Sequence, residues 1–355
     1  MTRPLDRATA FCQRFGLEVP LLMAPMAGSS PPGLAAAVAQ AGGMGGCGAL
    51  ALTPAGMADW AARFRQMTDG VFQINLWVPD PEPVRDPAAE AALSRFLARF
   101  GPAPTPPDGP LLEDFAAQFD ALLSVAPPVA SSIMGLFAPD QVAALKAAGI
   151  AWIATATTLE EGLLAEAAGA DAVIAQGVEA GGHRGAFTPA DAGRATVGAM
   201  ALIPALADAV SVPVIAAGGI GDGRGVAAAL MLGASAAMVG TALLRTPEAA
   251  IAPVWAEALA RARPEDTVVT PAFSGRAARA LRNAYTEAAA DPAAPPPAPY
   301  PLQRHLTEPM RRAALEAGDP AHAYMLAGQS ARLASPDPAD ALIRRIWSEA
   351  EGLLA

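Results

Sequence analysis

The chain has 355 residues, of which 53% are hydrophobic and 16% charged, so intrinsic disorder is excluded and a large core is expected. Its net charge of −10 argues against a nucleic-acid partner, which would call for a basic face. Two cysteines, Cys12 and Cys47, are too few for a disulfide framework and lack metal-ligand spacing, so we expect a reducing compartment and no metal site. No window approaches the ~18 apolar residues of a membrane span, and the first residues do not resemble a signal peptide, which predicts a cytoplasmic protein without a membrane partner.

Short apolar runs alternate with helical stretches along most of the chain. The expected strands cover residues 21–26, 43–50, 71–78, 129–134, 150–156, 172–176, 212–217 and 236–240. The expected helices between them cover residues 33–40, 54–66, 140–148, 159–168, 197–209 and 222–232. Strict alternation predicts a parallel sheet, and eight strand–helix units predict a closed (β/α)8 TIM barrel over residues 1–246. An open doubly wound sheet is the main alternative.

Two parts of the chain do not follow this alternation of strands and helices. Prolines cluster between residues 80 and 128, around helical stretches at 88–99 and 111–123, which predicts an insertion outside the barrel pattern. After residue 246 we expect a helix at 248–263 and then charged, proline-interrupted helical segments over 267–324. These features predict a smaller helical cap domain over 247–325 and a C-terminal segment, 326–355, that returns to the barrel and ends in an amphipathic helix.

Glycines end the last two expected strands, at the edge where barrel enzymes bind their ligands. Gly218 and Gly219 follow the seventh strand, and Gly240 and Thr241 follow the eighth. Glycines at these positions let backbone N–H groups face a phosphate directly, aided by a helix N-terminus. Tight turns without a ligand are the alternative.

Polar amides stand at two other strand ends. Asn75 ends the third strand and Gln176 the sixth, while Ala24 lies at the end of the first. An amide inside an apolar barrel is costly unless it is hydrogen-bonded. Each amide can bond the edge of a flat heteroaromatic ring or simply cap its own loop.

After the sixth expected strand, Gly181 and Gly182 precede His183. Paired glycines let the backbone adopt conformations that side chains forbid, or let a ligand approach it closely. The histidine is then held by backbone geometry while its ring stays free for chemistry; a loop histidine without function is the alternative. For the other two histidines, His305 and His322, surface or packing roles are expected.

The segment Gly43–Gly48 matches the G-x-G-x-x-G pattern of dinucleotide sites, with Asp69 at roughly the required spacing. Its glycines precede or lie within a strand instead of leading from a strand into a helix, so no dinucleotide site is expected here. The chain has a single lysine, Lys146, which is expected on the outside of the barrel. If the chain binds a ring that gains negative charge on reduction, the group that stabilises this charge would then be a backbone N–H, an arginine or the histidine.

Six motifs in order resemble those of the nitronate monooxygenase family, formerly called 2-nitropropane dioxygenases, of the class I type. They cover residues 23–28, 72–76, 176–185, 216–224, 274–279 and 327–329, so the similarity spans nearly the whole chain apart from the proline-rich insertion. The resemblance implies an FMN-dependent barrel enzyme with a helical second domain and the site between them. It implies oxidation of alkyl nitronates by O2 to carbonyl compounds and nitrite, with the chain a monomer or homodimer.

The resemblance also implies roles for individual residues. His183 matches the family's active-site histidine. The implied cofactor contacts are Met23, Ala24, Asn75, Gln176, Gly181, Gly182, Gly218, Gly219, Gly240, Thr241 and Gln329. Tyr300 and Tyr324 are candidates for the substrate mouth.

Two alternatives to this function stay open. The same glycine–histidine turn occurs in a flavin-dependent enoyl-acyl-carrier-protein reductase and in NADH:quinone reductases, so an FMN-dependent NAD(P)H reductase is one. A phosphate-binding barrel without redox chemistry is the other. If the chain oxidises nitronates, His183 either donates a hydrogen bond to nitronate oxygens or acts as a base on a neutral nitroalkane.

Overall fold

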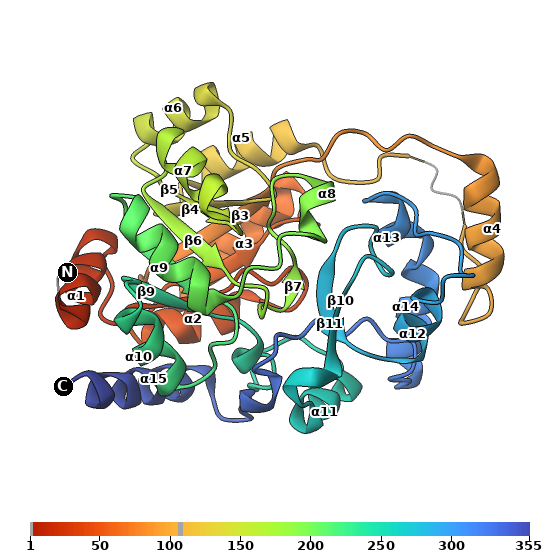
Figure 1. Cartoon of the computed structure of the whole chain (residues 1–355). Helices are drawn as coiled ribbons and strands as arrows, with labels where there is room; N and C mark the ends of the chain where they lie inside the picture. The colour runs from red at the N-terminus through yellow and green to blue at the C-terminus, as the bar shows by residue number, and fades with distance from the viewer. Residues whose placement is uncertain (1–2, 106–108) are drawn as a thin grey trace.

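The structure, a computed structural model, describes residues 3–105 and 109–355. Eight parallel strands are arranged in the order β1-β9-β8-β6-β5-β4-β3-β2, and a bridge between Leu22 and Met44 joins the two ends of that sheet (Figure 1). The strands are β1 (Leu21–Met23), β2 (Gly45–Gly48), β3 (Phe72–Trp77), β4 (Val129–Ile133), β5 (Ala151–Ala156), β6 (Ala172–Gln176), β8 (Val214–Ala217) and β9 (Ala236–Val239). The predicted (β/α)8 barrel is confirmed, and the open sheet is excluded.

Helices surround the barrel and begin at the residues that the sequence marks as caps. Thr53, Thr158 and Asp222 each accept a hydrogen bond from a backbone N–H of the first turn that follows. These outer helices are α2 (Pro32–Gln40), α3 (Pro54–Met67), α5 (Phe115–Val125), α6 (Pro139–Ala147), α7 (Leu159–Ala167), α9 (Ala199–Ala209), α10 (Gly223–Met231) and α15 (Ala339–Leu354). In the described part of the chain, no helix is both long enough and apolar enough to cross a bilayer.

An unpredicted helix, α1 (Pro4–Phe15), precedes the barrel. Its Phe11 and Phe15 lie one turn apart on the same face and are buried with strand residues that include Leu22 and Ile215. This cluster forms the inner layer of the barrel. The outer layer is the larger cluster between strands and helices.

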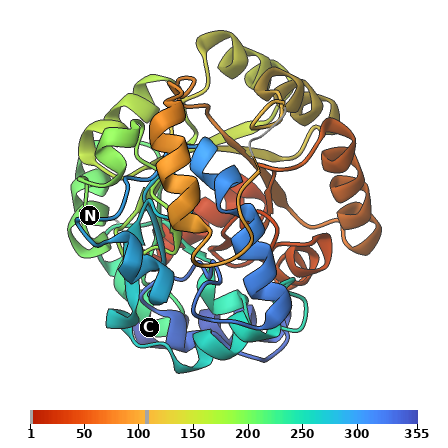
Figure 2. The ribbon, with the colours of Figure 1, turned by 90° about the vertical axis from the view of Figure 1, so that its right-hand side faces the viewer.

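A second, smaller domain lies beside the barrel, and both views place α4 (Pro87–Leu97) next to helices from beyond residue 300 (Figures 1 and 2). Its own core joins Phe96 of α4 to Phe273, Tyr285 and Met310. Its other helices are α12 (Ala284–Ala289), α13 (Leu302–Leu306) and α14 (Glu308–Ala317). Between this domain and the barrel the chain also forms α11 (Pro253–Arg261), which starts later than the helix predicted at 248–263.

The predicted insertion over residues 80–128 is therefore divided between the two cores. Its second helix, α5, packs in the barrel, where Gln118 donates to the carbonyl oxygens of Ala49 and Leu52 at 2.9 and 2.8 Å. Phe119 meets Phe137 edge to face. Placing this part outside the barrel pattern was wrong, because α5 packs against α3 and β3 as the barrel helix that leads into β4. Residues 106–108 lie outside the described residues.

A small sheet corrects the helical prediction for residues 267–324. The strands β10 (Thr267–Thr270) and β11 (Ala278–Leu281) form an antiparallel pair, and β11 also pairs with β7 (Gly182–His183). The run Thr-Val-Val-Thr in β10 is β-branched throughout, which favours a strand over a helix. The remaining short elements are α8 (Pro189–Ala192), η1 (Thr241–Leu243), η2 (Pro264–Asp266) and η3 (Ala331–Leu333).

Candidate active site

His183 lies in β7, on the strand that the small sheet fixes. Ala278 of β11 is its ladder partner, and the next residue, Arg184, donates its N–H to the carbonyl of Ala277 at 2.9 Å. The histidine therefore stands where the barrel meets the chain's last third. Backbone pairing, rather than a flexible loop, determines where the imidazole is held.

Gln176, at the end of β6, holds the same turn from the barrel side. Its Nε2 donates to the carbonyl of His183 at 3.1 Å, and its Oε1 accepts from the Gly185 N–H at 2.8 Å. Arg184 is buried and donates to Gln176 Oε1 at 3.1 Å and to the Gly177 carbonyl at 2.8 Å. Burial lowers the pKa of Arg184 to about 10, so it stays charged at neutral pH. The predicted contact of Gln176 with a cofactor is untested; what the amide does here is shape the turn.

The imidazole of His183 faces two aromatic rings and one hydroxyl. Its Nε2 lies 2.8 Å from Ser274 Oγ. Trp77 approaches edge-on with ring centroids 4.8 Å apart, and Tyr300 lies 6.2 Å away. We call the space bounded by Trp77, His183, Ser274 and Tyr300 the histidine recess. It draws on the end of β3, on β7, on the β10–β11 connection and on the second domain.

The electrostatics of the recess keep His183 uncharged. Burial, followed by the positive charges of Arg276, Arg304 and Arg311, lowers the pKa of His183 to about 3. In the protein without substrate the ring is a neutral imidazole at physiological pH. The same three arginines make the recess attractive to an anion, although the chain as a whole carries a net charge of −10.

A buried ion pair ties the segments around the recess together. The guanidinium of Arg276 contacts both carboxylate oxygens of Asp80 and donates to the carbonyl of Ala186. Neither charged group is open to solvent, with side-chain exposures of 0% and 6%. One arginine thus joins the segment after β3, the loop after β7 and the β10–β11 connection.

The predicted phosphate loops and the C-terminal segment meet at one place. Gly328 donates its N–H to Thr241 Oγ1 at 3.0 Å, and Gln329 donates to the Glu179 carbonyl at 2.9 Å. A Cβ on Gly181 would stand 2.5 Å from the Gly328 nitrogen, so this close approach requires glycine.

The backbone of these loops tests whether a phosphate fits. Among the described residues, no hydrogen bond uses the N–H groups of Gly218, Gly219, Gly240 or Thr241. Four free amides at the ends of β8 and β9 form the donor set that the phosphate of FMN needs. The residues present therefore fit the predicted group.

Three other predicted residues occupy different surroundings. Ala24 lies against Gly240, where β1 meets β9. Asn75 is buried at the inner side of β3 and donates from Nδ2 to Ser131 Oγ at 3.1 Å. Met23 is fully buried in the outer layer, so only its backbone faces the barrel mouth. Among the residues that the structure describes, none has an atom within 4 Å of the position that a Cβ on Gly182 would take.

Sequence reasoning missed four residues around the histidine: Trp77, Asp80, Ser274 and Arg276. Trp77 lies two positions after Asn75 on the same strand, and strand alternation places both side chains on one face. That signal was available. Asp80 and Arg276 are 196 positions apart in the sequence, so no local pattern predicts that they pair. Of the histidines given packing roles, His305 contacts the Leu111 carbonyl and His322 pairs with Asp319.

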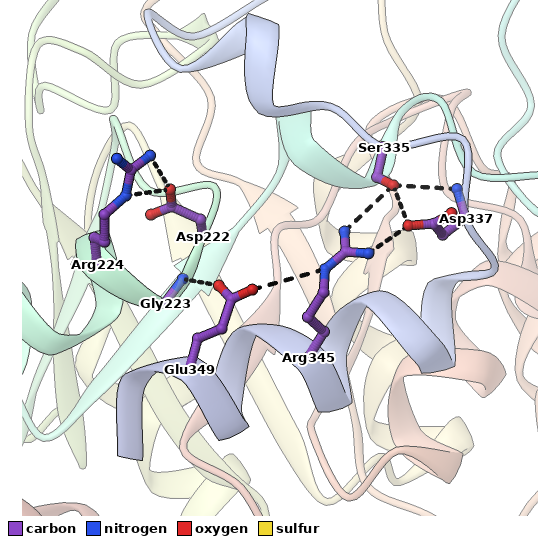
Figure 3. Close-up of polar contacts among 7 residues, drawn as sticks. All are labelled: Asp222, Gly223, Arg224, Ser335, Asp337, Arg345 and Glu349. Carbon is purple, nitrogen blue, oxygen red and sulfur yellow. Dashed lines mark hydrogen bonds and ion pairs between the residues drawn. The ribbon is translucent and has the colours of Figure 1, made fainter. Parts of the chain in front are cut away.

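A separate cleft of about 620 Å³ lies between α10 and α15. Figure 3 shows its charged side chains, which pair within each helix end, while a backbone N–H of α10 reaches a carboxylate of α15. Arg224 pairs with Asp222, and Arg345 pairs with Asp337 and reaches Glu349 at 4.0 Å. Glu349 also accepts from the Gly223 N–H at 3.2 Å. This cleft contains none of the predicted site residues.

Comparisons with known proteins agree with one another. The profile of the nitronate monooxygenase family matches residues 9–349. A nitronate monooxygenase from Pseudomonas aeruginosa is 42% identical over 352 residues, covering 96% of this chain and 99% of the relative. Among solved structures, a nitroalkane oxidase from Streptomyces ansochromogenes has a TM-score of 0.87 at 39% identity, covering 95% of this chain and 97% of that one. FabK from Thermotoga maritima has a TM-score of 0.73 at 28% identity, covering 97% and 96%. Given this agreement and the histidine recess at the barrel mouth, the chain belongs to the nitronate monooxygenase family, whose members are flavin-dependent oxidoreductases.

Proposed function

We propose that this enzyme oxidises alkyl nitronates with O2, using FMN, to give carbonyl compounds and nitrite. The observation that carries the proposal is the neutral His183 in a recess within the positive field of three arginines, together with a set of unpaired backbone amides that suits a flavin phosphate. Family membership supports the same reaction. We further propose that the enzyme acts on small molecules in the cytoplasm as a monomer or homodimer; its two cysteines are unpaired and buried, as a reducing compartment favours.

The chain's residues divide the work of holding FMN. The amides of Gly218, Gly219, Gly240 and Thr241 would hold the phosphate, and Ala24 and Asn75 would face the ring system. The main chain of Gly181, Gly182 and Gln329 would close over the ribityl side. When bound, FMN supplies an acceptor for electrons from an electron-rich carbon.

The recess places the substrate. Trp77 and Tyr300 provide apolar walls that exclude water. A nitronate anion entering the recess meets the field of three guanidinium groups and stands beside His183. An adjacent anion raises the pKa of an imidazole, so the ring takes up a proton and donates a hydrogen bond to a nitronate oxygen. His183 thereby orients the anion and balances its charge.

Anaerobic mixing tests the proposal against its main alternative. The purified protein should show flavin absorbance, and ethyl or propyl nitronate should bleach it rapidly while NADH and NADPH should not. In air, nitrite should form with turnover. Rapid bleaching by NADH or NADPH, with slow bleaching by nitronates, would establish an NAD(P)H reductase instead. A colourless protein that binds no added FMN would leave only a phosphate-binding barrel.

A further inference from the structure

Ser274 is the one hydroxyl that contacts the His183 ring in the described structure. It is 1% exposed and lies in the connection between β10 and β11. The connection is rigid at this point: Gly275 has a φ of +87°, and a Cβ there would stand 2.4 Å from the Ala298 carbonyl oxygen. The backbone therefore fixes where the Ser274 oxygen stands relative to the imidazole.

A serine hydroxyl has one proton, and here two neighbours compete for it. Ser274 Oγ lies 2.8 Å from His183 Nε2 and 2.9 Å from the carbonyl oxygen of Arg276. A carbonyl oxygen can only accept a hydrogen bond, and the described residues offer the buried Arg276 carbonyl no other donor. Leaving a buried carbonyl unpaired costs about 1–3 kcal/mol. The Ser274 hydroxyl accordingly donates its proton to the Arg276 carbonyl. Of its two lone pairs, one accepts from the Arg276 N–H at 3.4 Å and the other faces the histidine.

It follows that Nε2 carries the imidazole proton. The other ring nitrogen, Nδ1, has no hydrogen-bond partner among the described residues. It is also not one of the described side-chain atoms that are fully buried without a partner. In the neutral ring Nδ1 is thus an accessible lone pair. The groups that face this ring are Trp77, Tyr300 and Ser274, with the charges of Arg276, Arg304 and Arg311 around them.

We propose that Ser274 is a positioning residue that holds His183 as the Nε2–H tautomer, so that Nδ1 is the atom that binds a proton when the nitronate enters. The expected effect of Ser274 on nitronate turnover rests on the proposed function, whereas the expected tautomer does not. A solvent proton forms a bond to Nδ1, and the resulting Nδ1–H donates to a nitronate oxygen while Nε2–H keeps its bond to Ser274. Without the serine oxygen, the neutral ring is free to adopt the other tautomer.

Tyr324 provides a matched control, because its hydroxyl is the other one near Ser274. Burial raises the pKa of Tyr324 to about 12, and Arg311 and the neighbouring Ser274 act in the opposite direction. Ser274 lies close enough to Tyr324 to lower its pKa through a side-chain hydrogen bond, but the Tyr324 oxygen has no partner in full hydrogen-bond geometry among the described residues. Tyr324→Phe therefore removes a nearby hydroxyl and leaves the bond between Ser274 and His183 in place.

The direct test is ¹⁵N NMR of the histidine rings in the holoenzyme, with Ser274→Ala, Ser274→Thr and Tyr324→Phe beside the unaltered protein. His305→Gln and His322→Gln identify the other two histidines. In the unaltered protein His183 Nε2 should give a protonated signal and Nδ1 an unprotonated one. Ser274→Ala should shift both toward a mixture, whereas Ser274→Thr and Tyr324→Phe should preserve the pattern. A protonated Nδ1 in the unaltered protein, or unchanged signals in Ser274→Ala, would overturn the proposal.

Kinetics supplies the second readout. Ser274→Ala should lower kcat/KM for ethyl nitronate about 10- to 100-fold, as expected for a residue that orients a functional group, and Ser274→Thr should restore most of the loss. Flavin content should stay the same in all variants. Because the NMR readout needs no nitronate, a protein with the expected tautomer but no nitronate oxidation would contradict the proposed function alone. The wrong tautomer would contradict the Ser274 proposal alone.

Discussion

The histidine recess and the cleft between α10 and α15 differ in how their polar groups are satisfied. In the cleft, each carboxylate drawn in Figure 3 meets an arginine, a serine hydroxyl or a backbone N–H. Around the recess, the hydroxyl of Tyr300 and the Nε of Arg276 are buried without a partner in the described residues. Nearby loops add backbone amides with which no residue of the described ranges forms a hydrogen bond. A hollow whose polar groups bond to each other marks the packing of two helices, whereas a space with unpaired polar groups is where a ligand is expected to bind.

Exposure separates the two regions in a second way. The arginines of the cleft are well solvated, with side-chain exposures of 78% for Arg224 and 49% for Arg345. The Arg276–Asp80 pair beside the recess is almost completely enclosed. Solvated ion pairs contribute little to stability, whereas removing one partner of an enclosed pair leaves an uncompensated charge. The predictions below use this contrast.

The largest expected effect is on catalysis at the recess. His183→Asn should lower nitronate oxidation about 10²–10⁴-fold, because it removes the group that takes up a proton beside the substrate. FMN should remain bound, since the amides that would hold the phosphate lie on other loops. Oxygen consumption with ethyl nitronate and flavin absorbance measure the two quantities. Unchanged turnover would show that the recess is not the site.

Asp80→Asn should give the largest loss of stability. It leaves the Arg276 charge buried without a counter-charge, and the free energy of unfolding should fall by about 3–5 kcal/mol. Urea denaturation followed by circular dichroism measures it. Asp337→Asn, which alters a half-exposed pair of the cleft, is the control. Equal losses in the two variants would contradict the distinction between the regions.

Acid pH should weaken the folded apoprotein partly through His183. The folded pKa of about 3 lies below the ordinary value of 6.5, so between those pH values the unfolded chain binds more protons and stability falls as the pH is lowered. In His183→Asn the free energy of unfolding should fall less steeply with decreasing pH between those two pKa values. Above pH 7 the slope of unfolding free energy against pH should be the same in both proteins. Denaturation curves of both apoproteins at several pH values provide the measurement; parallel declines would mean that the ring is not held neutral.

The smallest effect is expected in the cleft. Arg345→Ala should cost no more than about 1 kcal/mol of unfolding free energy and leave kcat/KM for nitronates unchanged, because its ion pairs are solvated. The same urea and oxygen-consumption assays apply. A tenfold loss of activity would show that the cleft communicates with the site.

The barrel was predictable because its signals are local. Strand runs such as Val173–Gln176 and Val214–Ala217 are short, apolar and closed by glycine or a polar amide, and their helices start at caps. The place of His183 after β6 followed from counting these units. The small sheet was missed because each strand has four residues or fewer and gains its stability from partners far along the chain.

The candidate site residues also differ in whether a local sequence pattern predicts them. Gly218 and Gly240 directly follow barrel strands, as the alternating pattern predicts, whereas Asn75 lies within β3, which continues to Trp77. Ser274 and Arg276 were visible only as part of a family motif, since their roles arise from contacts with His183 and Asp80 that the sequence does not bring near. The use of Gln176 to shape the histidine turn likewise depends on the three-dimensional path from residue 176 to residue 185.

The pairing of β7 with β11 gives the chain an order of assembly. All eight barrel strands lie between residues 21 and 239, so during synthesis they leave the ribosome before Ala278–Leu281, the ladder partner of Gly182 and His183. A nascent chain that stops short of residue 278 has every barrel strand and the glycine turns after β8 and β9 but no strand to hold its histidine. During translation the position of His183 is thus fixed only after β11, which pairs with β7, has been synthesised.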